Sequence, residues 1–538
     1  MSGFFIGRIG RPGWVLLFLL TASLFFLIGC EDLGDGSSGR GDDDDDDDDM
    51  FDDDDDDGYD DDDDDDYYDD DDDDAGDDDD DSTPPPPEPE EDIDPGTRPR
   101  ICNGAVFVLN EQGDFVSRID MVSLDVDTIE VGDDPALLRA TNDCRAMVTL
   151  NTGEDTVSII DTQTNEVQTV SIRPDLNALA LSPDNHYAVA FHQFVANGGS
   201  HGYGEISIVD LTTCAVRSLA IGFPPDQAVV TQDNKALLAS ETTLAMVDLT
   251  DGGFSTVNMG FDLDAGQVLK KVMVTADSAY AFLLAEASTA LKALDLSNMT
   301  VTDLELECYP TDLDVAENGD VSLALCRQDG HIFVIDNNTL NFVVYETDEV
   351  VGSGELASDG GLALLFTNAE AIERVHVFDP ADGSLTTLPT YKPLIGAAIA
   401  PQDRTAILFH YGGDFQPIDD FDAYLDMRDA FSIMNLTDMR INTIEVPQTP
   451  LLVSFDEQGR NGIIPLPDYR QVALAHLDGG LADVITMPST PLEVGLLADL
   501  NLGFVLQDHS LGRISFVDVE TLEVRTITGF LLNGGIGQ

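Results

Sequence analysis

The sequence predicts an all-β protein of the β-propeller class. From about Gly104 to the C-terminus one pattern recurs about every forty residues: an apolar strand, a strand ending in Asp, a β-branched strand, and an apolar strand introduced by proline. The second unit shows it most plainly, as DTVSIID (155–161), VQTVSI (167–172) and LNALALSPD (176–184). Four short strands at this period are typical of propeller blades. The β-branched, period-two character excludes a helical solenoid.

The second strand of each unit ends in an acidic residue or Asn, and these residues count ten units: Asp120, Asp161, Asp210, Asp248, Asp295, Asp336, Asp379, Asn435, Asp478 and Asp518. An Asp that follows a strand at a turn bonds nearby backbone N–H groups. We therefore expect the repeated Asp to cap turns rather than to bind metal or catalyse.

Prolines introduce the last strand of many units: Pro135, Pro174, Pro225, Pro310, Pro393, Pro450 and Pro491. Proline tolerates the start of a strand because its missing N–H costs little there. Since no linker-like composition interrupts the array, one wide ring of ten blades is favoured over two smaller propellers. The chain enters at the first strand of a unit, 105–109, so we expect the tail 530–536 to supply the missing inner strand of the first blade.

The N-terminus, residues 1–29, reads as a secretory signal. Arg8 and Arg11 precede an apolar run, 14–28, which is shorter than the roughly 20 residues of a bilayer span. The sequence Leu27, Ile28, Gly29, Cys30 resembles the bacterial lipobox. The resemblance implies cleavage before Cys30, diacylglycerol on its thiol and fatty acylation, such as palmitate, of a protein anchored in the cell envelope. An uncleaved membrane helix is the alternative, and both inner and outer membrane stay open.

Residues 30–100 form a linker with almost no apolar material. Residues 42–81 contain 32 aspartates, and a Pro-rich acidic stretch follows. Such a composition predicts a disordered, self-repelling tether. Carboxylates attract Ca²⁺, but the run lacks the fixed spacing of a tight site, so diffuse counterion binding is favoured over a calcium cofactor. No other cofactor is indicated.

The propeller itself, residues 101–538, resembles the YVTN or YncE-like family of the lactonase and nitrite-reductase-like propellers. The resemblance rests on DTVSIIDTQTNEVQTVSI (155–172) and LALSPDN (179–185), and is best in units two, six and ten. Members of that family usually have seven or eight blades, and ten units exceed this number. The kinship implies a lactonase-like hydrolase as one possible activity, although a fold alone does not carry an activity.

Cysteine usage fits an oxidising compartment. Cys308 and Cys326 are placed almost symmetrically about a turn at 317–319, which predicts a disulfide across an antiparallel pair. Cys102 and Cys144 occupy similar places in successive units and form a second possible pair, which leaves Cys214.

Candidate binding residues follow the first strands of several units, in loops that a propeller places on one face. They comprise four histidines, His192, His201, His410 and His509, and the polar side chains of the long insertion 411–428, namely Tyr411, Asp414, Asp419, Asp420, Asp422 and Tyr424. Decorated loops on a rigid scaffold commonly carry binding function. The histidines come from separate units, so solvated side chains are favoured over a metal site.

Several function classes lack support. Only 24 Lys and Arg are spread over a chain of net charge −81, which disfavours a nucleic-acid partner. There is no Cys-x-x-Cys-His for haem and no P-loop, and the only tryptophan is Trp14 in the signal. The match Gly198–Gly202 around Ser200 lies in a Gly-rich loop rather than at a strand-to-helix elbow. The remaining expectation is a tethered scaffold that binds a protein or a glycan.

Overall fold

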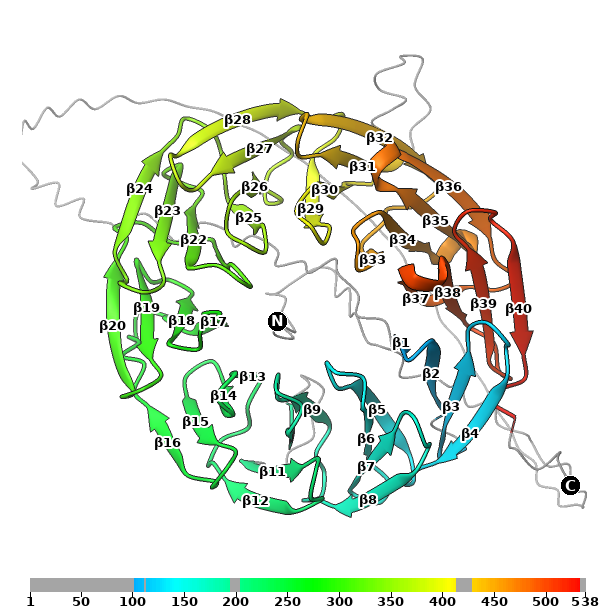
Figure 1. Cartoon of the computed structure of the whole chain (residues 1–538). Helices are drawn as coiled ribbons and strands as arrows, with labels where there is room; N and C mark the ends of the chain where they lie inside the picture. Colours follow the sequence, from blue (N-terminus) through cyan, green and yellow to red (C-terminus); the bar gives the residue numbers. More distant parts are fainter. Residues whose placement is uncertain (1–100, 111–112, 194–203, 413–427, 533–538) are drawn as a thin grey trace, which may run out of the picture. The chain divides into compact units, whose positions relative to one another are not determined.

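The computed structural model describes residues 101–110, 113–193, 204–412 and 428–532. These residues form ten four-stranded antiparallel sheets, and each sheet is one blade of a ring with its first strand innermost and its fourth strand at the rim (Figure 1). The propeller class and the count of ten blades are confirmed. A single ring, rather than two smaller propellers, is what the repeat builds.

Blades 1 to 5 contain these strands: β1 Ile101–Cys102, β2 Ala105–Asn110, β3 Phe115–Asp120, β4 Val126–Glu130; β5 Pro135–Ala140, β6 Ala146–Asn151, β7 Thr156–Asp161, β8 Val167–Ser171; β9 Ala178–Leu181, β10 Tyr187–Phe191, β11 Glu205–Asp210, β12 Val216–Ala220; β13 Gln227–Val230, β14 Lys235–Ala239, β15 Leu244–Asp248, β16 Phe254–Val257; β17 Leu269–Val274, β18 Tyr280–Ala285, β19 Ala290–Asp295, β20 Thr300–Glu305.

Blades 6 to 10 contain the remaining strands and three short 3-10 turns: β21 Asp312–Val315, β22 Val321–Cys326, β23 His331–Asp336, β24 Phe342–Glu346; β25 Ser353–Leu356, β26 Ala363–Phe366, β27 Arg374–Asp379, β28 Ser384–Pro389; β29 Leu394–Ile399, β30 Thr405–His410, β31 Asp429–Asn435, β32 Arg440–Val446; β33 Ser454–Phe455, β34 Asn461–Leu466, η1 Pro467–Tyr469, β35 Gln471–His476, η2 Leu477–Gly479, β36 Leu481–Thr486; β37 Pro491–Leu497, η3 Ala498–Leu500, β38 Leu502–Gln507, β39 Arg513–Asp518, β40 Val524–Thr528.

The core lies between blades, which explains the period-two pattern. Successive side chains of a strand point to opposite faces of its sheet. In β7, Val157 and Ile159 pack with residues of blade 3 such as Val209, whereas Ile160 packs with residues of blade 1 such as Val116. Each blade therefore buries both faces against its neighbours.

Ring closure differs from the expectation. The first blade has its own innermost strand, because Ile101 and Cys102 pair with Val106 and Ala105. Residues 530–532 of the tail form no strand, so the prediction that the tail completes blade 1 is wrong as far as the described residues extend. Residues 533–536 lie outside them.

Side-chain contacts close the ring instead of a shared strand. Phe504 and Phe516 of blade 10 pack with Ile119 of blade 1 in one buried cluster, together with Phe530 of the tail. Ser117 Oγ donates to the Phe530 carbonyl at 3.0 Å, and the Arg525 guanidinium donates to backbone carbonyls of blade 1. The tail thus acts as a clamp on blade 1.

Two disulfides are present. Cys102 of β1 is bonded to Cys144, in the turn before β6, so the bond joins blades 1 and 2. Cys308 is bonded to Cys326, the last residue of β22. Among the described residues Cys214 is a free thiol, and its Sγ donates to Gln168 Oε1.

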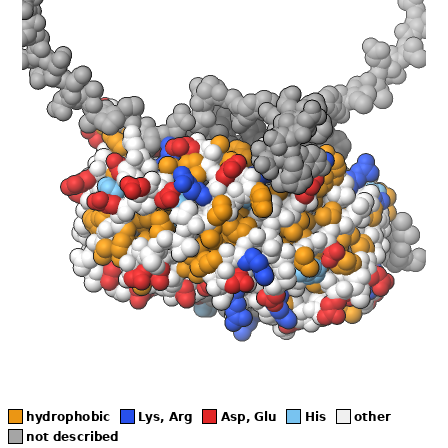
Figure 2. All heavy atoms as spheres, turned by 90° about the horizontal axis from the view of Figure 1, so that it is seen from above, with side chains coloured by type: hydrophobic (Ala, Val, Ile, Leu, Met, Phe, Trp, Pro, Cys, Tyr) orange, Lys and Arg blue, Asp and Glu red, His pale blue; other side chains and the backbone are white. Residues whose placement is uncertain are grey.

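Antiparallel alternation gives the ring two different faces. The second-to-third strand connections and the passages from each fourth strand to the next blade lie on one face, here called the loop face. The first-to-second and third-to-fourth turns lie on the other, here called the turn face. Seen edge-on, the rim shows apolar side chains among carboxylates, lysines and arginines (Figure 2). In the part of the chain that is described, no helix is both long and apolar enough to cross a bilayer.

Candidate functional site

The predicted binding residues belong to the loop face by topology, but several of them cannot be placed. His201, Asp414, Asp419, Asp420, Asp422 and Tyr424 lie outside the described residues. His192, His410, Tyr411 and His509 are described, and they come from blades 3, 8 and 10. They therefore form no single cluster in the described body.

His410 is not a loop residue, which corrects the sequence interpretation. It is the last residue of β30 and is fully buried. Its Nδ1–H donates to the Lys392 carbonyl at 3.0 Å, and its Nε2 accepts from Ser432 Oγ at 2.7 Å. Burial lowers the pKa of this imidazole to about 4, so the ring is neutral at physiological pH. With both nitrogens engaged, His410 is a structural residue rather than a ligand.

The repeat explains why a histidine is buried there. In blade 2 the equivalent position is Asn151, whose Nδ2 donates to Ser158 Oγ at 2.9 Å, and Ser158 bonds Thr169. In blade 10, Gln507 bonds Ser515, which bonds Thr526. Blade 8 has His410, Ser432 and Thr443 at the matching places. We call this set of three side chains, one from each of the second, third and fourth strands, a polar column.

Both ends of the long insertion are fixed to the blades beside it. At its start, Tyr411 Oη donates to the Asn368 carbonyl of blade 7 at 2.8 Å. At its end, the Lys392 ammonium donates to the Arg428 carbonyl, and Thr449 Oγ1 donates to Asp429 Oδ1 at 2.6 Å. Residues 411 and 428 are thus held at defined points on the loop face, next to the polar column of blade 8.

Several exposed apolar side chains lie on the loop face from the passage between blades 7 and 8 to the end of blade 10. Tyr391, in the passage from β28 to β29, is 63% exposed, and Tyr469, in η1, is 56% exposed. Tyr411 is 41% exposed. Three leucines on the same face of blade 10 and the tail are also exposed: Leu492, Leu511 and Leu532. We call Tyr391, Tyr411, Tyr469 and these leucines the loop-face apolar set.

The other two histidines of the predicted binding set that the structure describes have local partners. His192 follows β10, and its Nδ1 donates to the Asp175 carbonyl at 2.8 Å. His509 Nδ1 accepts from the Leu511 backbone N–H at 3.2 Å, within its own turn. Each histidine shapes the loop in which it lies, and the two belong to blades 3 and 10.

The inner edge of the ring carries a chain of charged contacts between blades 5 and 7. Lys271 Nζ of β17 lies 3.4 Å from Asp312 Oδ1 of β21. Asp312 and Asp314 also accept the Gly354 and Leu356 backbone N–H groups of β25. Burial, partly offset by Lys271, raises the pKa of Asp314 to about 6. These contacts tie three inner strands together and leave the carboxylates engaged in the scaffold.

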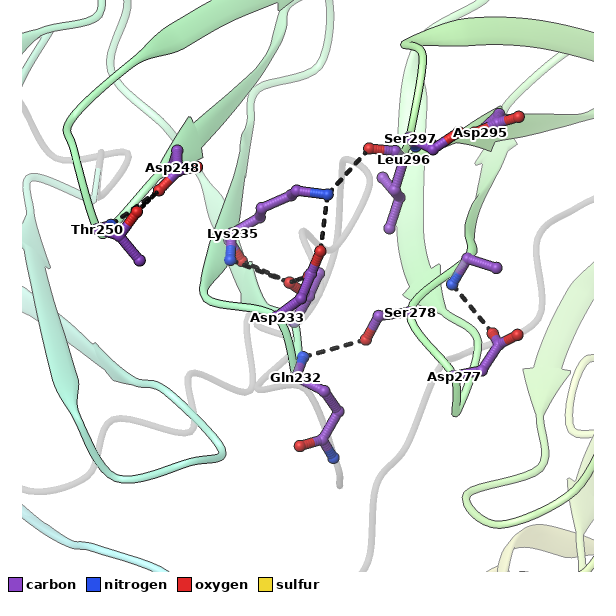
Figure 3. A network of polar contacts seen from close by, with 12 residues as sticks. Gln232, Asp233, Lys235, Asp248, Thr250, Asp277, Ser278, Asp295, Leu296 and Ser297 are labelled. Carbon is purple, nitrogen blue, oxygen red and sulfur yellow. Dashed lines mark hydrogen bonds and ion pairs between the residues drawn. The ribbon is translucent and has the colours of Figure 1, made fainter.

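The repeated Asp residues cap turns, as their positions predict. Asp161 Oδ1 accepts the Gln163 and Thr164 backbone N–H groups at 2.9 and 2.8 Å, and these bonds lower its pKa. In blades 4 and 5, Asp248 and Asp295 bond Thr250 and Ser297 of their own turns (Figure 3). Their carboxylates serve the backbone of the turn face.

One of the ten capping assignments is wrong. Asp478 lies in η2, beyond the end of its strand. In blade 2, the capping residue Asp161 pairs with Ala146, the first residue of the second strand. In blade 9 the residue in this position is His476, which pairs with Asn461. The prediction relied on the Asp that recurs in this turn, and it missed that the strand of blade 9 ends two residues before Asp478. A strict alignment of strand ends would have singled out His476.

Within 101–110, 113–193, 204–412 and 428–532, no three His, Cys, Asp or Glu side chains group closely enough to hold a metal ion. The fold together with this loop face defines the protein as a propeller with a decorated face.

No protein-family model and no curated protein matches the chain. Several solved structures resemble it at low identity. The dihydro-heme d1 dehydrogenase NirN, in complex with DHE, is 16% identical over 64% of this chain and 73% of its own, with a TM-score of 0.42. AztD from Citrobacter koseri, in its apo form, is 13% identical over 63% of this chain and 93% of its own, with a TM-score of 0.36.

Proposed function

We propose that this protein is a lipid-anchored protein of the bacterial envelope whose propeller binds a protein partner through its loop face. The anchor rests on the lipobox at Cys30, and the YVTN-like kinship on the residues of unit two. A glycan partner was equally open from the sequence. The loop-face apolar set now favours a protein, because aromatic side chains are enriched at protein–protein interfaces.

The exposed tyrosines carry the proposal. A tyrosine offers a large contact area and a hydroxyl at low entropic cost, so exposed tyrosines on a rigid base suit recognition. Tyr391 and Tyr469 lie in short connections between strands, and Tyr411 stands at the fixed start of the insertion.

The histidines predicted from the sequence and described on the loop face do not favour the hydrolase alternative. His410, one of the candidate binding residues, is buried and engaged at both nitrogens. General acid–base catalysis requires a group within reach of the substrate. We therefore propose binding as the function.

The binding proposal is tested by site-specific photo-crosslinking in intact cells. A photoreactive amino acid at Tyr391 and at Tyr469 should each give a crosslinked species of the same mass, and the double variant Tyr391→Ser, Tyr469→Ser should lose the partner. Matched probes at Val343 and Leu481, which are 55% and 65% exposed on the rim strands β24 and β36, serve as controls. Equal crosslinking from loop-face and rim probes would contradict the proposal.

The anchor is tested separately. The variant Cys30→Ser should lose incorporation of labelled palmitate and should leave the membrane fraction, because the acylated thiol is absent. A matched Cys214→Ser variant should keep both properties. Retention of the label by Cys30→Ser would show that the lipobox interpretation is wrong, whatever the crosslinking result.

A further inference from the structure

Blades 9 and 10 enclose a cavity on the turn face, opposite the proposed partner surface. Its volume is about 370 Å³. The polar lining comes from both blades: Asp456, Arg460, Asn461, His476 and Asp483 from blade 9, and Asn501 and Glu520 from blade 10. A volume of this size accommodates a small molecule. The cavity is therefore large enough for a ligand the size of one sugar ring.

Blade 9 departs from the repeat at this cavity. In the other nine blades the third strand ends in Asp or Asn, which caps the following turn. In blade 9 the turn is closed by η2, with the Gly480 N–H bonded to the Leu477 carbonyl. His476 therefore occupies the position of the capping residue without capping the turn. Its ring is one of the groups that line the cavity.

A line of four side chains fixes the orientation of this imidazole. Asp456, which is buried, accepts the Asn461 side-chain N–H at 2.9 Å. The Asn461 oxygen therefore faces His476 Nδ1, at 3.0 Å, and accepts a hydrogen bond from the ring N–H. His476 Nε2 lies 3.1 Å from Asp483 Oδ2. Both ring nitrogens thus face side-chain oxygens, which hold the ring in one orientation.

Closing the turn does not require this line of four side chains, because a single Asp or Asn caps the corresponding turn in the neighbouring blades. The line ends at Asp483, whose side chain is 49% exposed. Across the cavity, Asn501 Nδ2 donates to Glu520 Oε1 at 3.3 Å. The cavity therefore presents carboxylates beside guanidinium and amide donors, and Val519 and Leu522 add an apolar strip.

We infer that this cavity binds a sugar, either free or as the terminal unit of a glycan. A hydroxyl group donates one hydrogen bond and accepts others, so neighbouring hydroxyls match carboxylates set beside guanidinium and amide groups. The C–H face of a pyranose ring would pack on Leu522. A metal ion fits poorly, because no metal-binding group of side chains occurs in the described residues.

The inference is tested by saturation-transfer NMR on the full-length protein. The probes are methyl β-D-glucoside, methyl β-D-galactoside and N-acetyl-D-glucosamine, with glycine as a charged non-sugar probe. We expect transfer to at least one sugar. The variants Asp483→Asn and Arg460→Gln should each weaken that binding at least tenfold. Asp483 and Arg460 are surface groups, so both variants should keep the wild-type melting temperature.

The connection between the third and fourth strands of blade 8, on the same turn face, supplies exposed controls. Asp438→Asn and Arg440→Gln change side chains that are each 55% exposed, and they should leave the sugar signal unchanged. The tyrosine variants of the loop face should also leave it unchanged, so this test is independent of the proposed function. Absence of transfer to every sugar, transfer to glycine alone, or a signal that survives in Asp483→Asn would overturn the inference.

Discussion

Blades 2 and 8 place the same polar column under very different connections. In blade 2, Asn151, Ser158 and Thr169 lie beneath a four-residue turn, 152–155. In blade 8, His410, Ser432 and Thr443 lie beside the long insertion 411–428. The buried base is retained while the connection grows. The polar column is therefore a constant base in both blades, and the variation that supports binding lies in the length of the connection beside it.

The strongest test of this comparison removes the column in blade 2. Asn151→Leu should lower the free energy of unfolding by about 3 kcal/mol, because a buried amide is lost and the hydroxyls of Thr149, Thr156 and Ser158 lose a partner. Chemical denaturation measures this. Asn151→Gln, which keeps the amide, should cost less. A loss below about 1 kcal/mol for Asn151→Leu would show that the column is dispensable.

The column of blade 8 should add a pH dependence that blade 2 lacks. The unfolded chain protonates His410 near pH 6.5, whereas the folded chain does so only near pH 4, so the unfolded state binds more protons between these values. Stability should fall as pH falls through this window, by at most roughly 3 kcal/mol. Denaturation from pH 7 to pH 4 measures the slope.

His410→Gln introduces the residue type that blade 10 has at this position, Gln507, and is the matched control. It should retain the column and reduce the slope over this pH window. An unchanged slope would assign the acid sensitivity to other groups and would weaken the comparison.

A smaller effect is expected where the insertion of blade 8 is fixed. Tyr411→Phe removes one hydrogen bond, to the Asn368 carbonyl, and should cost about 1 kcal/mol. Because the start of the insertion is then less constrained, limited proteolysis within 411–428 should accelerate. Tyr391→Phe, at the neighbouring exposed tyrosine, should change neither quantity.

The smallest effect concerns the turn caps, which the two blades share. Asp161→Ala in blade 2 and Asn435→Ala in blade 8 should each cost about 0.5 to 1 kcal/mol, since each removes two hydrogen bonds to turn N–H groups. Thermal melting measures both. A much larger loss in only one blade would mean that the two turns are not equivalent.

The repeat predicted the class, the number of blades and the role of the capping Asp, because these depend on periods that a single sequence displays. It misplaced the closure of the ring, since the two-residue strand Ile101–Cys102 is too short to show a period. It also treated His410 as a loop residue, because a buried histidine and a solvated one look alike until the column of the neighbouring strands is seen. The cavity beside His476 depends on a strand end that lies two residues before Asp478, and the sequence of that turn does not reveal this shift.

The disulfide between Cys102 and Cys144 has a mechanical consequence. The chain that precedes Ile101 enters the body through β1, which holds to blade 1 by only two residue pairs. A pull from that side would peel such a strand away from its neighbour one pair at a time. The covalent bond to Cys144 routes the load into the second blade instead, where full-length strands resist in shear. The disulfide therefore protects the short strand β1 from being pulled out of its sheet.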